Sequence, residues 1–257
     1  MHVPRARVLA GDLAPHAEQT VRVAGWIHRR RRLSGVTFLV IRDRSGLVQV
    51  IVKDPATVEQ VAALGEESVV DVVGQVTPSA QAPGGYEITD PRITALGDPA
   101  ATPPVELWRP RLNAGLAVLL DNAAVTLRHP LARARWQLAA ATMRGFRDTL
   151  DRLGFTEVQS PKLVGTSTES GANVFEVDYF GRPAYLAQSP QFYKQTLVGV
   201  FERVYEIGPV FRAEPHDTVR HLAEYVSLDV EFAFIETPVY FEGQACLMLY
   251  VAIGDPS

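Results

Sequence analysis

The sequence predicts an α+β protein in which a small closed β-barrel precedes a region of helices and antiparallel strands. Apolar residues alternate with polar ones along much of residues 20–97, which is typical of short, half-buried strands. Along residues 129–154 they recur every three or four positions, the spacing of one face of a helix. Two further strand-like segments, 204–214 and 223–235, flank a densely charged stretch. These three observations define the expected order of elements.

The barrel is predicted from four or five short strands that follow one another within about eighty residues. Turn-like sequences separate them, among them Arg44-Ser45-Gly46 and the APGG that ends at Gly85. The expected strands are TVRVAGWI (20–27), GVTFLVIRD (35–43), GLVQVIVKD (46–54), SVVDVVGQV (68–76) and GYEITDPRITAL (85–96).

The proline-rich segment GDPAATPPVELWRPR follows the last strand and interrupts both periodicities. It predicts a hinge between two domains, which we place at residues 101–125. The barrel domain then takes residues 1–100 and a second domain takes residues 126–235. Residues 236–257 are expected to form a divergent tail.

The second domain is predicted to begin with a long amphipathic helix from His129 to Gly154. Pro130 suits the first turn of a helix, and Gly154 suits its C-terminal exit. The apolar stripe consists of Ala139, Met143, Phe146, Leu150 and Leu153. A strand, FTEVQSPKL, follows and is expected to stop at Pro161, and a second helix covers PQFYKQTLVGVF (190–201).

The charged stretch between the last two strands carries groups that bind nucleotides. Arg212 can hold a phosphate through two parallel hydrogen bonds, and Glu214 can accept a proton from an exocyclic amine. Tyr225 offers a flat ring for a base, while Arg220 and His221 can cover a polyphosphate. A salt-bridged, solvated surface hairpin is the alternative, because runs of charge usually form exposed faces.

The order FRAE, RHLAEY and SLDVEF resembles motif 2 of the class II aminoacyl-tRNA synthetases, and the strand ending at Pro161 resembles motif 1. The segments SPKLVGTSTESGANVFEVDYF and QSPQFYKQ, together with His216, resemble the aspartyl-tRNA synthetases of the archaeal and partly bacterial kind. The segment GWIHRRRRLSGVTFLVIRDRSGLVQV resembles their anticodon-binding OB-fold. The resemblance implies a five-stranded OB-fold barrel followed by part of a class II antiparallel sheet flanked by helices.

The resemblance also implies roles for the charged residues. Arg212 would hold the α-phosphate of ATP and act in catalysis, Glu214 would recognise adenine, and Tyr225 would stack on it. Arg220 and His221 would approach the pyrophosphate or the tRNA acceptor end. The amino-acid pocket would comprise Glu169, Gln188, Ser189, Gln191, Lys194 and Asp229.

Within that pocket, Lys194 would pair with the β-carboxylate of aspartate, and Glu169 would meet the substrate ammonium. Taken alone, Lys194 reads as a solvent-facing helix lysine and Glu169 as a loop carboxylate without a role. Mg²⁺ is expected to enter with ATP, and no metal site formed by protein residues alone is predicted. Adenylate formation depends on positioning and charge neutralisation more than on acid–base groups.

The barrel is expected to grip the anticodon. We expect the arginine run at residues 29–32 to lie in the loop between the first two strands, where OB-folds meet nucleic acid. Phe38 would stack on an unpaired base, a contact worth about 1–3 kcal/mol, and Gln49 would read a base edge. The implied anticodon-binding set is Trp26, His28, Arg29, Phe38 and Gln49. A solubilising arginine run beside a core phenylalanine is the alternative.

The resemblance implies an aspartate–tRNA ligase that acts on tRNA(Asp), and His28 and Pro78 favour a form that also acts on tRNA(Asn). A homodimer through the motif 1 region is implied as well. The third class II motif, with its arginine and Mg²⁺-binding acids, is not found after Ile235, so we expect impaired adenylation. The alternatives are a non-catalytic tRNA-binding remnant and a relative of the asparaginyl-tRNA synthetases.

Composition limits which partners and which cellular compartment the sequence allows. The net charge of −4 means that any basic nucleic-acid site must be local. The single cysteine, Cys246, cannot form an internal disulfide and fits a reducing compartment. The first residues lack the apolar core of a secretory signal, and the longest apolar run, at 245–253, is too short to span a bilayer. We therefore expect a cytoplasmic protein without a membrane partner.

Overall fold

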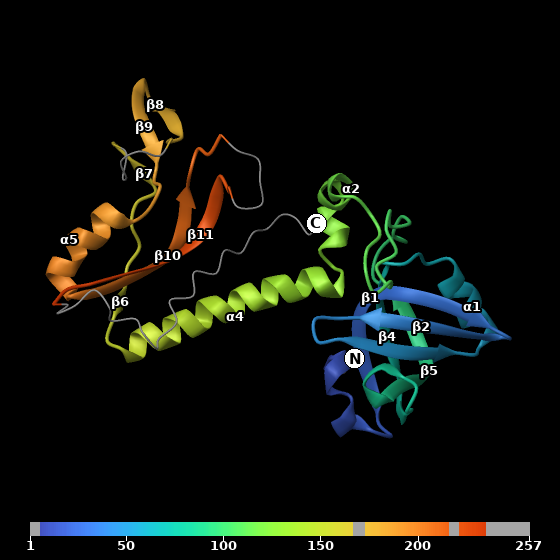
Figure 1. The fold of residues 1–257 in the computed structure, drawn as a ribbon. Helices are drawn as coiled ribbons and strands as arrows, with labels where there is room; N and C mark the ends of the chain where they lie inside the picture. Colours follow the sequence, from blue (N-terminus) through green and yellow to red (C-terminus); the bar gives the residue numbers. More distant parts are fainter. Residues whose placement is uncertain (1–5, 167–172, 216–220, 235–257) are drawn as a thin grey trace. The chain divides into compact units, whose positions relative to one another are not determined.

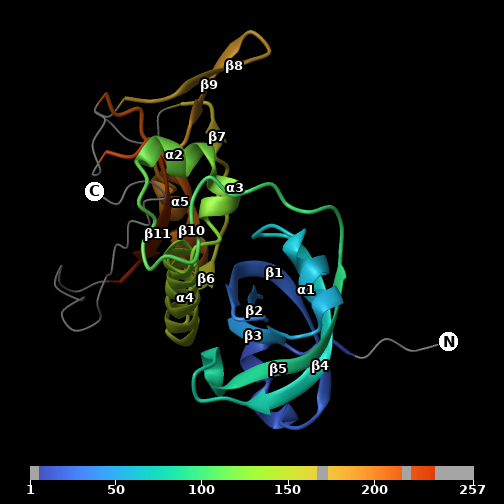
Figure 2. The same cartoon turned by 90° about the vertical axis from the view of Figure 1, so that its right-hand side faces the viewer.

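The computed structural model describes residues 6–166, 173–215 and 221–234 (Figures 1 and 2). The chain divides into two compact units, residues 1–132 and residues 133–257. No helix among the described residues has the length and apolar character needed to cross a bilayer.

The first unit is a closed five-stranded barrel, which confirms the prediction for residues 20–97. The strands neighbour one another in the order β1-β2-β3-β5-β4, and β3 and β5 run parallel while the other pairs are antiparallel. Their bounds are β1 Thr20–Leu33, β2 Val36–Arg42, β3 Leu47–Val52, β4 Val69–Pro78 and β5 Tyr86–Ala95. Short 3-10 helices lie at η1 Ala10–Asp12, η2 Ala14–His16 and η3 Pro83–Gly85.

The alternation in the sequence fills the interior of the barrel. Inward positions of every strand are apolar and fully or nearly fully buried, because successive side chains of a strand point to opposite faces. The core is formed chiefly by Val21, Val23, Ile27, Leu39, Ile41, Val48, Val50, Val70, Val72, Val76 and Ile88. Gly25 permits the close crossing of β1 and β2, since a Cβ there would lie 2.3 Å from the carbonyl oxygen of Arg42.

The arginine run at residues 29–32 does not lie in a loop, so that prediction is wrong. A β-bulge between Ile27 and Arg29 lets β1 continue to Leu33, paired with β2 throughout. The turn is confined to Ser34 and Gly35, which both have positive φ angles.

Arg30 has a structural partner within this strand. Its Nη1 donates to the carbonyl oxygens of Val61, Ala62 and Leu64 at 2.6–2.8 Å. These carbonyls belong to the C-terminal end of a helix, where a cation is favoured.

That helix, α1 Pro55–Ala62, connects β3 to β4 and was not predicted. Asp54 caps it by accepting hydrogen bonds from the backbone N–H of Thr57 at 2.8 Å and from the Thr57 hydroxyl at 2.7 Å. Pro55 occupies the first helical position. Asp-Pro-x-Thr was therefore a readable start signal.

The segment predicted as a hinge contains two short helices, α2 Leu116–Asp121 and α3 Ala123–Thr126. Ahead of them, Leu107 is buried and the indole of Trp108 contacts two guanidinium groups. The Cζ of Arg29 is 3.8 Å from the ring centroid of Trp108, and that of Arg109 is 4.4 Å away. This part of the segment is therefore attached to the barrel.

The second unit contains a long helix, a three-stranded sheet, a smaller sheet and a second helix. The sheets have the orders β11-β10-β6 and β7-β9-β8. The bounds are α4 Pro130–Arg152, β6 Thr156–Glu157, β7 Leu163–Val164, β8 Glu176–Tyr179, β9 Arg182–Leu186, α5 Gln191–Phe201, β10 Arg203–Phe211 and β11 Glu224–Phe232. The predicted helices and the antiparallel β10–β11 pair are present, while the strand before Pro161 is shorter than expected and runs parallel to β10.

One face of the β10–β11 pair packs on the predicted stripe of α4. Leu150 contacts Tyr205 and Ile207 in this core, and Phe146 meets the Tyr205 ring edge-on at 5.8 Å. The Tyr205 hydroxyl donates to Asp151 at 2.8 Å, and burial, followed by this hydrogen bond, raises the pKa of Tyr205. The opposite face of the strands is thereby left to polar residues.

Candidate functional site

The polar face of the β10–β11 pair collects the residues that the sequence singled out. The register places Glu206 opposite Asp229, Gly208 opposite Ser227 and Val210 opposite Tyr225. Directly opposed residues of antiparallel strands project to the same side of the sheet. This side is the one away from α4, because Tyr205 and Ile207 occupy the α4 side.

Lys194 reaches this face from α5 and is buried, with a side chain that is only 5% exposed. Its Nζ donates to Asp229 Oδ1 at 3.0 Å and lies 3.4 Å from Glu231 Oε2. The other Asp229 oxygen accepts a hydrogen bond from Ser227 Oγ at 2.5 Å. A buried ammonium at the centre of this network is not the solvent-facing helix lysine of the alternative interpretation. Glu231 was not singled out from the sequence.

Arg212 and Tyr225 lie together at the far end of the same face. The Arg212 Cζ is 5.8 Å from the Tyr225 ring centroid, within the range of a cation–π contact. The backbone N–H of Arg212 donates to the Ala223 carbonyl at 2.9 Å, which extends the strand ladder past Phe211. Glu214 is half-buried, and its N–H donates to the Arg212 carbonyl at 2.8 Å. The side chains of Arg212 and Tyr225 therefore lie together, and the backbone of Glu214 is joined to that of Arg212.

The QSPQ segment enters the site from β9. Gln188 is fully buried, and the half-buried Ser189 accepts a hydrogen bond through Oγ from the N–H of Gln191 at 3.2 Å. Gln191 is the first residue of α5, so this turn sets the direction of the helix that carries Lys194. Glu169, His216 and Arg220 lie outside the described residues, and His221 is exposed.

A second buried ion pair on this face was missed by the sequence reasoning. Lys162 Nζ lies 2.5 Å from Glu206 Oε1, and Ser160 Oγ donates to Glu206 Oε2 at 2.7 Å. Lys162 and Glu206 are 44 positions apart in the sequence, and no local pattern joins them. Within the part of the chain that the structure describes, no three His, Cys, Asp or Glu side chains are grouped so that they could hold a metal ion.

The outer face of the barrel carries most of the candidate nucleic-acid residues. Cross-strand pairing aligns Arg31 with Phe38 and Ile51, and aligns Arg29 with Val40, Gln49 and Glu87. The half-buried Phe38 has the Arg31 Cζ 5.9 Å from its ring centroid. Gln49 is buried, and its Nε2 donates to Glu87 Oε2 at 3.0 Å.

A charged network lies at one end of this face. Arg42 and Glu67 are both buried and form a two-bond ion pair at 2.8 and 2.7 Å. Arg128 adds a third hydrogen bond to Glu67 at 2.7 Å, and Trp26 lies within 6 Å of both guanidinium groups. Burial opposes the charge of Glu67, but the hydrogen bonds from Arg42 and then Arg128 outweigh it and lower the pKa of Glu67.

His28 occupies the β-bulge beside this network and is only 5% exposed. Its Nδ1 lies 3.2 Å from Arg42 Nη1, so the ring nitrogen accepts from the guanidinium in the neutral form. Burial, and then the positive charge of Arg42, lower the pKa of His28 to about 4. His28 is therefore a neutral, internally paired residue near neutral pH.

The His28 environment predicts a pH-dependent stability. Because the folded pKa lies below the ordinary value of 6.5, the unfolded chain takes up the proton first as the pH falls. Stability from neutral His28 is complete above pH 6.5 and is lost as the pH drops toward 4. We expect a loss of about 2 kcal/mol in barrel unfolding free energy between pH 7.5 and 5.

Denaturant unfolding of the full chain, followed across that pH range, measures this loss. His28→Gln should flatten the dependence, whereas the control His16→Gln should retain it. Equal slopes for wild type and His28→Gln would rule out this role for the ring.

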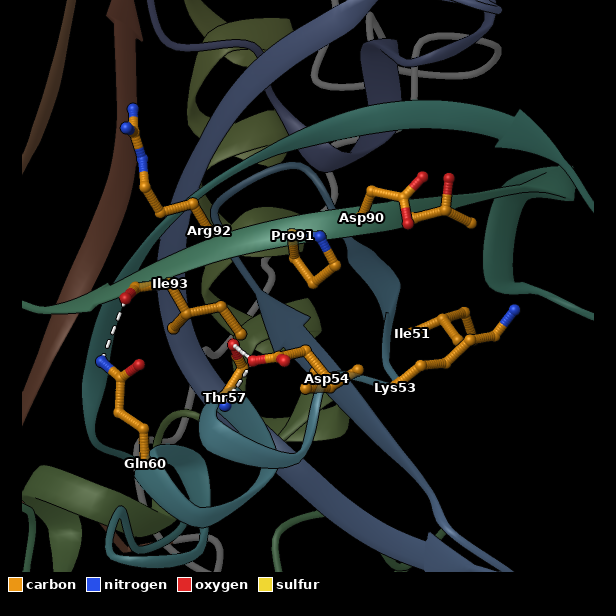
Figure 3. A pocket seen from close by; sticks show the side chains of 11 residues that line it. Ile51, Lys53, Asp54, Thr57, Gln60, Asp90, Pro91, Arg92 and Ile93 are labelled. Carbon is orange, nitrogen blue, oxygen red and sulfur yellow. Dashed lines mark hydrogen bonds between the residues drawn. The ribbon is translucent and has the colours of Figure 1, made fainter.

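The barrel also contains a cavity of about 420 Å³ between α1 and β5 (Figure 3). Gln60 closes one side by donating to the Ile93 carbonyl at 3.0 Å. Lys53, Asp54, Thr57, Asp90 and Arg92 supply its polar lining, and Ile51 is shared with the row that contains Phe38. This cavity is distinct from the polar face of β10–β11, which belongs to the other unit.

Comparison with known protein families identifies two matching regions of the chain. Residues 116–251 match the family described as tRNA synthetases class II (D, K and N), and residues 21–96 match the OB-fold nucleic acid binding domain. The chain belongs to the class II tRNA synthetases of the D, K and N group.

Among individual proteins, the chain is 47% identical over 232 residues to an aspartate–tRNA(Asp/Asn) ligase of Thermus thermophilus, covering 89% of this chain and 53% of that protein. It is 45% identical over 236 residues to the enzyme of the same name from Deinococcus radiodurans, covering 92% and 53%. Asparaginyl-tRNA synthetase from Pyrococcus horikoshii, solved with asparaginyl-adenylate, superimposes with a TM-score of 0.82 at 32% identity, covering 91% and 54%. The chain spans about half the length of the curated relatives it matches.

Proposed function

We propose that this chain takes part in aspartate–tRNA ligation: the ATP-dependent activation of L-aspartate and its transfer to tRNA(Asp), and also to tRNA(Asn). The observation that carries the proposal is the ion pair of the buried Lys194 with Asp229, on the sheet face that also bears the Arg212–Tyr225 pair. The names of the similar ligases, which specify both Asp and Asn tRNAs, support the dual acceptor.

Two steps make up the reaction. A carboxylate oxygen of aspartate attacks the α-phosphorus of ATP, pyrophosphate leaves, and aspartyl-AMP forms. A ribose hydroxyl at the tRNA 3′ end then attacks the aspartyl carbonyl carbon, and AMP leaves. In this proposal Arg212 neutralises the α-phosphate charge and Tyr225 supports the adenine, so positioning and electrostatics carry the first step. The proximity of the Arg212 and Tyr225 side chains supports this assignment.

Lys194 determines which amino acid is bound in this proposal. A buried ammonium attracts the negatively charged β-carboxylate of aspartate more strongly than the neutral amide of asparagine. Asp229 and Glu231, which hold Lys194 from β11, leave its position fixed before the ligand arrives. Glu169 remains our candidate for the ammonium of the substrate.

Two other functions are consistent with the family. The structural similarity to an asparaginyl-tRNA synthetase favours an asparagine-binding relative, and the barrel by itself favours a tRNA-binding protein without catalysis. Calorimetry of the 257-residue chain with L-aspartate and L-asparagine, pyrophosphate exchange, and filter binding of tRNA distinguish them. Aspartate binding and exchange support the ligase, whereas tRNA binding alone supports the non-catalytic alternative. A preference for asparagine would refute the proposal.

Phe38 provides a test of the proposed anticodon face. Phe38→Ala should weaken binding of tRNA(Asp) transcript by about 5- to 100-fold, since stacking of one base on an aromatic ring contributes about 1–3 kcal/mol. Filter binding at fixed salt measures the change. Tyr86→Ala, an aromatic truncation on β5, serves as the control for general effects on the barrel. An unchanged affinity in Phe38→Ala would remove Phe38 from the tRNA contact.

The proposal includes a homodimer, a cytoplasmic location and Mg²⁺ that enters with ATP. Leu131 and Leu138, seven positions apart on one side of α4, are 52% and 63% exposed, which supports an interface along this helix. Sedimentation equilibrium tests it, and a mass of one chain at micromolar concentration would contradict it. The ion would supply charge neutralisation beside the phosphates of ATP.

A further inference from the structure

The Lys162–Glu206 ion pair lies on the β10–β11 face that forms the candidate site. The Glu206 carboxylate is 1% exposed, and both of its oxygens are engaged, one by Lys162 and one by Ser160. The Ser160 N–H adds a contact at 3.2 Å, and Lys162 Nζ also donates to Ser160 Oγ at 3.0 Å. A carboxylate this deeply buried requires a paired cation to remain charged.

Glu206 lies directly opposite Asp229 in the β10–β11 register. Opposed side chains on antiparallel strands have Cβ atoms about 4.5–5.5 Å apart, and two like charges in these positions destabilise the sheet. Each carboxylate instead has its own lysine: Lys162 pairs with Glu206, and Lys194 pairs with Asp229. The two ion pairs lie side by side on one face.

The backbone of Lys162 is also joined to the ligand-binding segments. Its carbonyl accepts from the N–H of Ala187 at 2.9 Å, and the Ala187 carbonyl accepts from the N–H of Phe211 at 3.0 Å. Ala187 precedes Gln188, and Phe211 precedes Arg212. These two hydrogen bonds therefore connect the backbone of Lys162 to the segment that carries Gln188 and to the segment that carries Arg212.

Gly208 leaves room for the pair. A Cβ at this position would lie 2.8 Å from Glu206 Oε1 and 3.3 Å from Lys162 Cε. The ion pair therefore occupies the volume that a side chain at position 208 would take.

We propose that Lys162 is a positioning residue for the amino-acid pocket. By neutralising Glu206, it keeps Lys194 on Asp229 and directed toward an arriving carboxylate, without contacting the substrate itself. In its absence, the unpaired Glu206 competes for the Lys194 ammonium across the sheet face. The inference rests on the proposed binding of L-aspartate.

A double-variant rescue tests this role. Calorimetric titration of the full chain with L-aspartate should show about 10-fold weaker binding for Lys162→Met than for wild type. The variant Lys162→Met/Glu206→Gln removes the charge and its partner together and should bind within about threefold of wild type. Thermal melts of each variant report whether it is folded.

The outcomes separate the hypotheses. Wild-type affinity in Lys162→Met would overturn the inference, and so would a double variant that binds as weakly as the single one, because both residues would then act only through the fold. If Lys162→Met does not fold, the double variant decides: near-wild-type affinity supports the inference, and weak binding overturns it. If the wild-type chain binds no aspartate, the proposed function fails and the inference fails with it.

Discussion

Replacing Lys194 by methionine should lower the affinity of the chain for L-aspartate by about 100-fold or more. Truncating one partner of a buried, hydrogen-bonded charge pair typically costs about 2–5 kcal/mol of binding free energy. The Lys194 ammonium is the one buried cation that α5 presents to this sheet face, and methionine preserves the length of the side chain. Discrimination against L-asparagine should fall in the same variant, because asparagine loses no charge–charge attraction.

Calorimetry with both amino acids measures the effect. Gln195→Met is the matched control, since this neighbouring residue of α5 is exposed and receives a side chain of the same size. We expect wild-type affinities for that control. Equal loss of aspartate and asparagine binding in Lys194→Met would show that Lys194 does not read the side-chain charge.

Glu67→Gln should destabilise the barrel by about 3 kcal/mol, because breaking a buried ion pair by removing one partner leaves an uncompensated charge. The charge left behind is on Arg42, whose side chain is 5% exposed. Arg128 is 37% exposed and can be hydrated, so the cost falls mainly on Arg42. Denaturant unfolding of the full chain measures the loss.

Glu66→Gln is the control for Glu67→Gln. Glu66 is half-buried, and burial raises its pKa, so neutralising it should leave stability unchanged or slightly higher. The lowered pKa of Glu67 sets the pH window: its contribution is complete above about pH 4.5 and is lost as the pH falls below this value. The gap between wild type and Glu67→Gln should therefore close in acid. A constant gap would contradict the ion-pair explanation.

Hydrophobic periodicity was sufficient to predict most of the fold. The alternation that gave the barrel strands and the stripe from Ala139 to Leu150 both reflect burial of one face, and burial dominates the energetics of folding. Helix α1 was not predicted, because its eight residues contain too few turns to display a helical period. Its capping sequence, beginning at Asp54, was the signal that remained.

The arginine run shows where charge patterns mislead. Four consecutive arginines suggest a solvated loop, yet alternating strand geometry sends them to two sides. Arg30 meets helix carbonyls and Arg29 meets an indole, and neither partner lies nearby in the sequence. Contacts with residues distant in the sequence therefore determine the conformation of this segment.

The candidate site was predictable in part. The spacing of Arg212 and Tyr225 around the charged stretch indicated two facing strands, and the structure joins the two residues. The ion pair of Lys162 with Glu206 was not predictable, because it depends on the parallel placement of β6 beside β10. The same limit applies to Glu231, whose proximity to Lys194 follows from how α5 lies across the sheet.

The contacts of the Trp108 indole with the guanidinium groups of Arg29 and Arg109 give the molecule an intrinsic fluorescent reporter. If the barrel binds RNA as proposed and a phosphate draws Arg29 away, the electric field at the indole changes, and we expect the wavelength of its fluorescence to shift. Addition of tRNA to the unlabelled chain would test this expectation, and Trp108→Phe would identify which part of the emission belongs to this ring.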